Sequence, residues 1–207
     1  MSSLLTHNLL VINQKAKLIE VTNEFKIRDE NGNDVGFIRQ EGQSTLKKVA
    51  RFVGSLDQFF THKLAVYDAD GTKVIELERP RKVFKSKVRV TGGDGRPVGA
   101  IIQKNVVGKI RFDLQGEMDQ RLGQIRADNW VAWDFAIVDS TEREVARITK
   151  KWGGFAKAVF TAADNYVVEI DPSLSGDLRL LVLASAAGVD TALKQDDRGL
   201  SLDDLVP

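Results

Sequence analysis

The chain has 207 residues, of which 43% are hydrophobic and 29% charged, as in ordinary globular proteins. Its formal net charge of +1 argues against a global basic field for nucleic acid, so an anionic partner would have to meet a local patch. It has no cysteine, which excludes disulfides, thiolate nucleophiles, zinc–thiolate sites and palmitoylation.

The chain has four prolines and no low-complexity tract, so we expect a single domain over 1–207 without a linker. We expect its core at about 9–195 and a polar tail at 196–207. The first fifteen residues lack a basic region and a cleavage pattern of small residues, so they do not resemble a signal peptide. We therefore expect a cytoplasmic protein.

A strand pair is predicted at 9–20, broken near 13–15, and one unit then recurs along the chain. In each unit an alternating segment meets a polar turn and a second alternating segment follows, at 25–38, 64–77, 88–102, 110–125 and 133–148. Alternation with period two predicts strands with one buried face, and Asn-Gly or Asp-Gly supplies the positive φ of tight hairpins. Serial hairpins predict an antiparallel sheet, and closure into a barrel removes its edges.

One segment breaks this rhythm, because apolar residues at 46, 49, 53, 56 and 60 recur at helical spacing with Lys47, Lys48 and Arg51 between them. Two interpretations stay open: a helix or irregular strand packed on the barrel, or a basic amphipathic helix on an anionic membrane.

The segment 178–194 is predicted to be a helix that is apolar on every side from 180 to 187. Such a helix must be enclosed by lipid or by protein. A bilayer span needs roughly 20 apolar residues, and Arg179 and Asp190 end this run too early. We therefore expect a mainly β fold: a closed antiparallel barrel of about twelve strands, too wide for its own side chains to fill, around this hydrophobic C-terminal helix.

Several motifs resemble those of the phospholipid scramblase family, within the tubby C-terminal-like group. These are the opening strands at 8–21, the strand ending in Glu78-Arg79-Pro80, the segment 96–103, and the tryptophan-containing strand at 148–154 followed by Asp164-Asn165-Tyr166. The likeness covers roughly 9–194. It implies a twelve-stranded barrel around a central helix, and a function in calcium-stimulated, bidirectional movement of phospholipids between leaflets.

The resemblance also implies a calcium segment, whose matching positions are Asp164, Asn165, Glu169 and Asp171. Where the family has acidic residues before the Asp-Asn pair, this chain has Ala162 and Ala163. A structural interpretation stands beside the functional one, because Glu169 alternates with apolar residues as in a strand. Asp171-Pro172 is also typical of a helix start.

The densest basic run supplies the candidate lipid-headgroup ligands. These are Arg79, Arg81, Lys82, Lys85, Lys87 and Arg89. Alternation places Lys85, Lys87 and Arg89 on one face of a strand, which could bind anionic phospholipid or could be a solvated surface. A nucleic-acid partner is not expected, because no aromatic platform accompanies the charges.

No catalytic motif is present, and the two histidines, His7 and His62, stand apart from any nucleophile pattern, so an enzyme is not expected. Two hypotheses remain. The first is a phospholipid scramblase-like protein, peripheral at the inner face of the plasma membrane. The second is a soluble barrel of the same fold that binds a small ligand or a protein. Cofactors other than calcium are not expected, and protein partners are not predicted.

Overall fold

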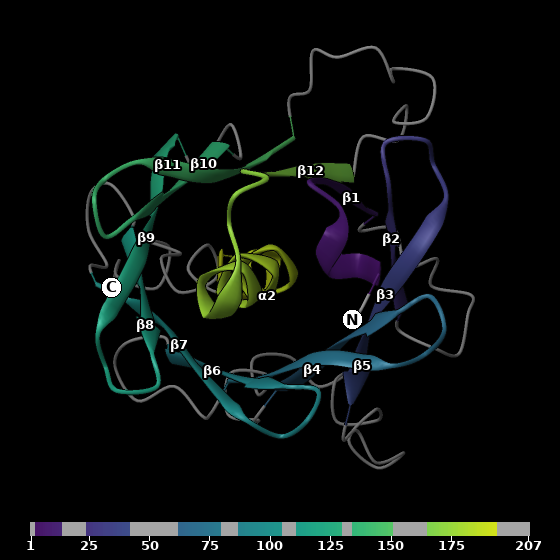
Figure 1. Ribbon diagram of the computed structural model, residues 1–207, viewed down its shortest axis with the longest axis horizontal. Helices are drawn as coiled ribbons and strands as arrows, with labels where there is room; N and C mark the ends of the chain where they lie inside the picture. Colours follow the sequence, from purple (N-terminus) through teal and green to yellow (C-terminus); the bar gives the residue numbers. More distant parts are fainter. Residues whose placement is uncertain are drawn as a thin grey trace, which may run out of the picture.

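The computed structural model is a closed antiparallel barrel wound around a C-terminal helix (Figure 1). It describes residues 3–13, 24–41, 62–79, 87–104, 111–129, 134–150 and 165–193. The strands in these ranges are β1 (Leu9–Asn13), β2 (Glu24–Arg28), β3 (Asp34–Glu41), β4 (His62–Asp68), β5 (Lys73–Arg79), β6 (Lys87–Gly92), β7 (Pro97–Gln103), β8 (Arg111–Gly116), β9 (Arg121–Asn129), β10 (Asp134–Asp139), β11 (Glu144–Thr149) and β12 (Asn165–Ile170). The helices are a 3-10 turn, η1 (Ser3–Thr6), and α2 (Gly176–Leu193).

Each strand pairs with its neighbours in sequence, and β1 pairs with β12 to close the barrel. The predicted twelve-stranded barrel is therefore confirmed. Several predictions lie outside the described residues: the second strand near 17–20, the amphipathic segment at 46–60, and positions 151–154 of the tryptophan-containing strand expected at 148–154.

Five hairpin turns, at 29–33, 68–72, 92–96, 116–120 and 139–143, share one geometry. In the first, the Asp29 amide donates to the Asn33 carbonyl at 3.0 Å and the Gly32 amide donates to the Asp29 carbonyl at 3.1 Å. The position equivalent to Gly32 has positive φ in every turn, including those that place Asp119 and Glu142 there. This three-residue loop with a bulge suits the right-handed twist of paired strands. We call this end of the barrel the hairpin end.

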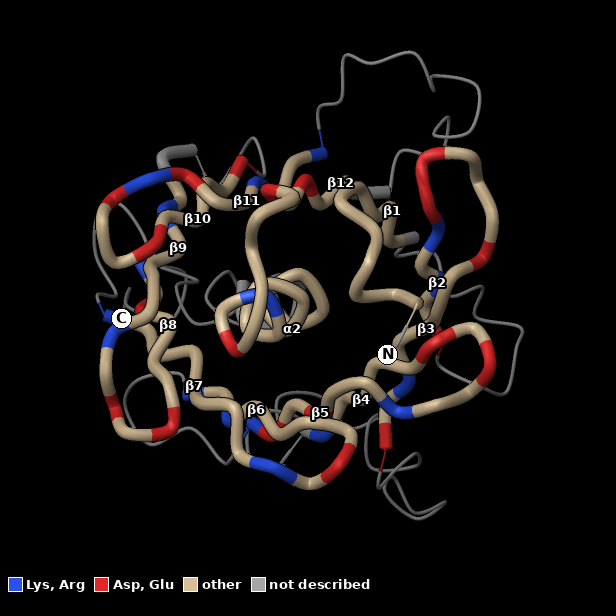
Figure 2. The backbone as a smooth tube through the Cα atoms, viewed as in Figure 1, with Lys and Arg blue, Asp and Glu red and all other residues tan. Residues whose placement is uncertain are grey.

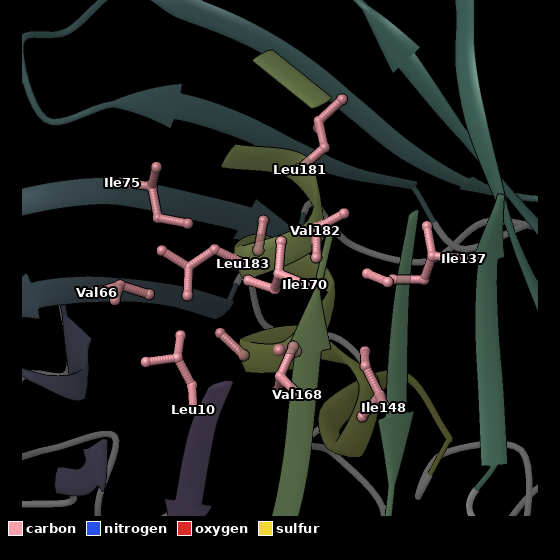
Figure 3. Close-up of a cluster of buried hydrophobic side chains, with 14 of the residues drawn as sticks. Leu10, Val66, Ile75, Ile137, Ile148, Val168, Ile170, Leu181, Val182 and Leu183 are labelled. Carbon is pink, nitrogen blue, oxygen red and sulfur yellow. The ribbon is translucent and has the colours of Figure 1, made fainter. Parts of the chain in front are cut away.

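Helix α2 fills the interior of the barrel. Its side chains from Leu181 to Ala186 are each at most 2% exposed, so no side of the helix faces water there. Figure 3 shows the inward-facing side chains of the strands packed around it, such as Ile75 and Ile137. The Tyr166 hydroxyl donates to the Ala186 carbonyl at 2.6 Å, which ties β12 to the helix. Enclosure of this helix by protein is thus confirmed, and none of the helices in the described ranges could cross a bilayer.

The N-terminal segment is joined to both the barrel and the helix. The buried Asp68 carboxylate accepts from the Ser3 amide and hydroxyl, both at 2.7 Å, and Leu4 inserts into the core at 1% exposure. The buried Arg179 of α2 donates to the His7 carbonyl at 2.7 Å and to Asn8 Oδ1 at 3.2 Å. These contacts link residues more than 60 positions apart, and the sequence offered no local signal for them.

The helix start predicted at Asp171-Pro172 is wrong. Residues 172–173 form a turn, and α2 begins at Gly176, whose φ of 65° lies outside the helical region. The Asp171 carboxylate caps that turn instead, because it accepts from the Ser173 amide at 2.8 Å. Asp and Pro favour turns as strongly as helix starts, so the dipeptide alone did not distinguish the two.

Candidate functional site

The predicted basic run divides between two sides of the barrel wall. Lys87 and Arg89 are exposed on the outer face of β6, where they alternate with inward-facing Val88 and Val90. Arg79, at the end of β5, is only 7% exposed, and the alternation of that strand places it on the inner side. Arg79 therefore does not share a surface with Lys87 and Arg89. Arg81, Lys82 and Lys85 lie outside the described residues.

Three further cations extend the surface around Lys87 and Arg89. Lys104 follows β7, Arg111 begins β8, and Arg126 lies on β9. The backbone joins them, because the Lys104 amide donates to the Arg111 carbonyl at 2.9 Å and Arg111 lies directly opposite Arg126. We call this surface the basic face: Lys87, Arg89, Lys104, Arg111 and Arg126. Sequence reasoning missed the last three because they are isolated along the chain and meet only through strand pairing.

One carboxylate lies within the basic face. Asp113 is the only acidic residue among the described side chains of β6 to β9, and its carboxylate is 3.2 Å from the Lys104 ammonium. It also accepts from the Gln124 amide at 3.0 Å. Gln124 Oε1 in turn accepts from Arg111 at 3.2 Å and from Arg126 at 3.1 Å. Asp113 thus forms an ion pair with Lys104 and is connected through Gln124 to Arg111 and Arg126.

Arg111 and Arg126 lie directly opposite each other on β8 and β9. Like charges directly opposite each other on neighbouring strands repel. Arg126 is partly compensated by an ion pair with Glu142, in the turn between β10 and β11.

The outer face of β3, β4 and β5 also has many charged residues, but there the cations form ion pairs with carboxylates. Lys73 contacts Glu41 at 3.0 Å and Glu76 at 3.1 Å, and Lys63 contacts Glu76 at 3.5 Å and Glu78 at 3.7 Å. Burial lowers the pKa of Lys73, but its hydrogen bonds to Glu41 and Glu76 outweigh burial and hold the pKa above its usual value. Lys63 and Lys73 on this surface are thus each held by two carboxylates.

The predicted calcium ligands do not fit one site where the structure describes them. Asn165 begins β12 and Glu169 lies four residues further along the same strand, a separation of roughly 13 Å, whereas calcium needs oxygens at about 2.3–2.6 Å. Asp171 is engaged by Ser173 and by Arg143 at 3.1 Å. The hydrogen bonds from Ser173 and the charge of Arg143 hold the pKa of the Asp171 carboxyl below its usual value.

Asp164 lies outside the described residues, so the set of four stays a prediction. In the part of the chain that the structure describes, no three side chains of metal-binding type come together.

A shallow groove of about 380 Å³ lies over β11, β12 and the start of β1. Its charged lining consists of Glu144, Glu169 and Asp171 with a single cation, Arg147. Arg147 is already held by Glu144 at 2.8 Å and by Asp134 at 2.6 Å. The groove therefore has the opposite charge character to the basic face and is a poor site for an anion.

Comparison with known proteins adds the family. The Scramblase family model matches residues 1–193. A phospholipid scramblase family protein of Schizosaccharomyces pombe is 23% identical over 80% of this chain and 46% of its own length. The altered inheritance rate of mitochondria protein 25 of Saccharomyces cerevisiae is 23% identical over 83% of this chain and 64% of its own length. Phospholipid scramblase 1 of Rattus norvegicus is 24% identical over 87% of this chain and 58% of its own length.

The chain thus spans roughly half to two thirds of the length of these relatives. A crystal structure of an Arabidopsis thaliana protein superposes with a TM-score of 0.51 at 13% identity, covering 91% of this chain and 94% of that one, and supports the barrel fold. Because the family model covers nearly the whole sequence, this chain belongs to the scramblase family.

Proposed function

We propose that this protein is a peripheral membrane protein of scramblase type that binds anionic phospholipid headgroups through its basic face. One observation carries the proposal: five cations gather on the outer surface of four neighbouring strands, where Asp113 is the only carboxylate among the described strand side chains and Glu142 reaches Arg126 from the turn between β10 and β11. Family membership supports a phospholipid as the anion, because the related proteins are named for phospholipid scrambling.

The charges can supply a useful affinity without a lipid anchor. A Lys or Arg close to an anionic membrane surface contributes about 1 kcal/mol. Five such residues would contribute about 5 kcal/mol, which corresponds to a membrane partition constant on the order of 10⁴. This is comparable with a single myristoyl chain, which gives reversible binding. Binding should therefore be reversible and should weaken with salt.

Movement of lipids between the two leaflets is a second and separate part of this proposed function. Helix α2 is enclosed by the barrel, so it does not provide the path. The inner, anionic leaflet of the plasma membrane is the surface that such a basic face would recognise. No step of the proposal depends on calcium, because the described members of the calcium set do not converge.

The test is flotation with vesicles of phosphatidylcholine alone or with phosphatidylserine. The variant is the double substitution Lys87→Gln/Arg89→Gln. Loss of two cations should weaken binding by about 2 kcal/mol, or roughly 30-fold. The matched control is Lys26→Gln/Lys63→Gln, which removes two cations that form ion pairs on β2 and β4, outside the basic face.

Binding that is equal for the two double variants would contradict the basic face, and absence of binding to anionic vesicles would contradict the lipid role. The soluble-module alternative would then be favoured. A chelator added to the same assay tests the calcium prediction. A fluorescent-lipid translocation assay in reconstituted vesicles tests movement between leaflets.

A further inference from the structure

The hairpin end of the barrel is strongly acidic. Each of the turns 29–33, 68–72, 116–120 and 139–143 contains two carboxylates, and the turn 92–96 contains one. The same five turns contain only two cations, Arg96 and Arg143. Figure 2 shows acidic residues on every one of these loops around the rim of the barrel. A rim of this kind repels an anionic surface.

The basic face lies toward the opposite end of the same strands. Lys87 and Arg111 are the first residues of β6 and β8, and Lys104 directly follows the last residue of β7. The acidic turns and the cations Lys87, Lys104 and Arg111 therefore lie at opposite ends of the described strands, although the net charge of the chain is only +1.

The division also runs around the barrel. The groove over β11 and β12 exposes Glu169 and carries three carboxylates with Arg147 alone. The basic face is on β6 to β9, and Figure 1 shows that β6 and β7 lie across α2 from β12, whereas β9 adjoins β10. The distribution of charge therefore differs both along the strands and around the barrel. Both differences place the cations on β6 and β7 at the end opposite the hairpin turns.

We propose that the barrel binds an anionic bilayer in a single orientation, with the basic face against the headgroups and the hairpin end directed into the water. This rests on the proposed function, because it assigns the geometry of the same lipid-binding surface. The asymmetry favours one orientation over the other: one orientation brings cations to the membrane surface, whereas the inverted one brings the turn carboxylates there, of which all but the buried Asp29 and Asp68 are accessible.

The length of the strands makes the selection effective. Arg111 lies seven residues before Met118, which is in the hairpin turn, and this separation corresponds to roughly 23 Å of strand. Charges are screened over about 8 Å at physiological ionic strength. When the basic face touches the membrane, the carboxylates of the turn at Met118 are therefore too distant to oppose binding at Arg111, while Glu142 of the turn 139–143 stays in its ion pair with Arg126.

Absence of cysteine in the chain allows a direct test, because one introduced cysteine carries one fluorophore. Ile102→Cys places the label in the middle of the basic face, since Ile102 lies opposite Lys87 on the neighbouring strand. Met118→Cys and Ser140→Cys place it on two hairpin turns, and Met118 is 84% exposed. Lys104→Cys supplies a second reporter on the basic face if Ile102→Cys does not fold as the unlabelled protein does.

The labelled proteins are mixed with phosphatidylserine-containing vesicles that carry a headgroup quencher. We expect quenching at position 102 to be several-fold stronger than at positions 118 and 140. Flotation of the same samples measures binding separately. Binding with equal quenching at all three positions would overturn the single orientation and leave the lipid role intact. Failure of the unlabelled protein to float would overturn the proposed function, and the orientation with it.

Discussion

The substitution Leu183→Ala tests whether α2 holds the barrel together. Leu183 is 2% exposed and lies beside Val66 and Ile75 of the barrel wall (Figure 3). Deletion of a buried leucine side chain costs about 2–5 kcal/mol, because burial is lost and a cavity remains. The better helix propensity of alanine offsets only a few tenths of this.

We therefore expect a loss of about 3 kcal/mol in unfolding free energy. For a chain of this size, 1 kcal/mol shifts the melting temperature by about 2–4 °C, so the variant should melt roughly 6–12 °C lower. The measurement is urea and thermal unfolding followed by circular dichroism. Leu180→Ala is the matched control, because it makes the same chemical change in the same helix at a half-buried position.

The control should lose less than half as much stability as Leu183→Ala. Equal losses for the two variants, or a loss below about 1 kcal/mol for Leu183→Ala, would refute the reasoning that the helix is packed tightly on every side.

Three further predictions concern the barrel wall and its hairpin end. Gly99→Ala should lose at least about 2 kcal/mol, because a Cβ at this φ of 151° would lie 2.0 Å from the Gln115 carbonyl oxygen on β8. Gly71→Ala is its control and should lose only about 1 kcal/mol, since that turn position has a φ of 84° and no atom within 4 Å. Arg179→Lys should lose about 1–3 kcal/mol, because one ammonium cannot reach the three acceptors that the guanidinium satisfies, and hydrogen exchange should show earlier opening of the N-terminal segment. Burial raises the pKa of Asp29, but hydrogen bonds from Asn33 and Asn31 outweigh it and hold the pKa below its usual value, so this group stabilises the fold above pH ~4 and the stability is lost as pH falls further. Urea midpoints measured from pH 7 to about pH 3 should decline less for Asp29→Asn than for the wild type.

Each of these has an outcome that would contradict it. Equal losses for the two glycine variants would show that the strands β7 and β8 can separate without cost. Wild-type stability of Arg179→Lys would show that its hydrogen bonds do not hold the N-terminal segment. Parallel pH profiles for the wild type and Asp29→Asn would remove Asp29 from the acid transition.

Local sequence patterns were sufficient for the architecture. Period-two alternation predicted the strands, and Gly32, Gly71 and Gly95 marked turns that require positive φ. The helix that is apolar on every side had to be enclosed, which predicted a closed barrel around it. These features can be predicted from the sequence because each depends on residues only a few positions apart. The family motifs pointed the same way, and the family model agrees with them.

The candidate site was only partly predictable. Lys87 and Arg89 were found because they are near neighbours in the chain, whereas Arg111 and Arg126 become neighbours only through the register of β8 and β9. Arg79 looked like part of the same run, but strand alternation turned it to the inner side of the wall. Sequence by itself thus determined which segments are strands, turns and helix, since those depend on local backbone preference and hydrophobic period. Only the tertiary structure decided which charges share a surface, because strand register and barrel closure join residues that no local pattern connects.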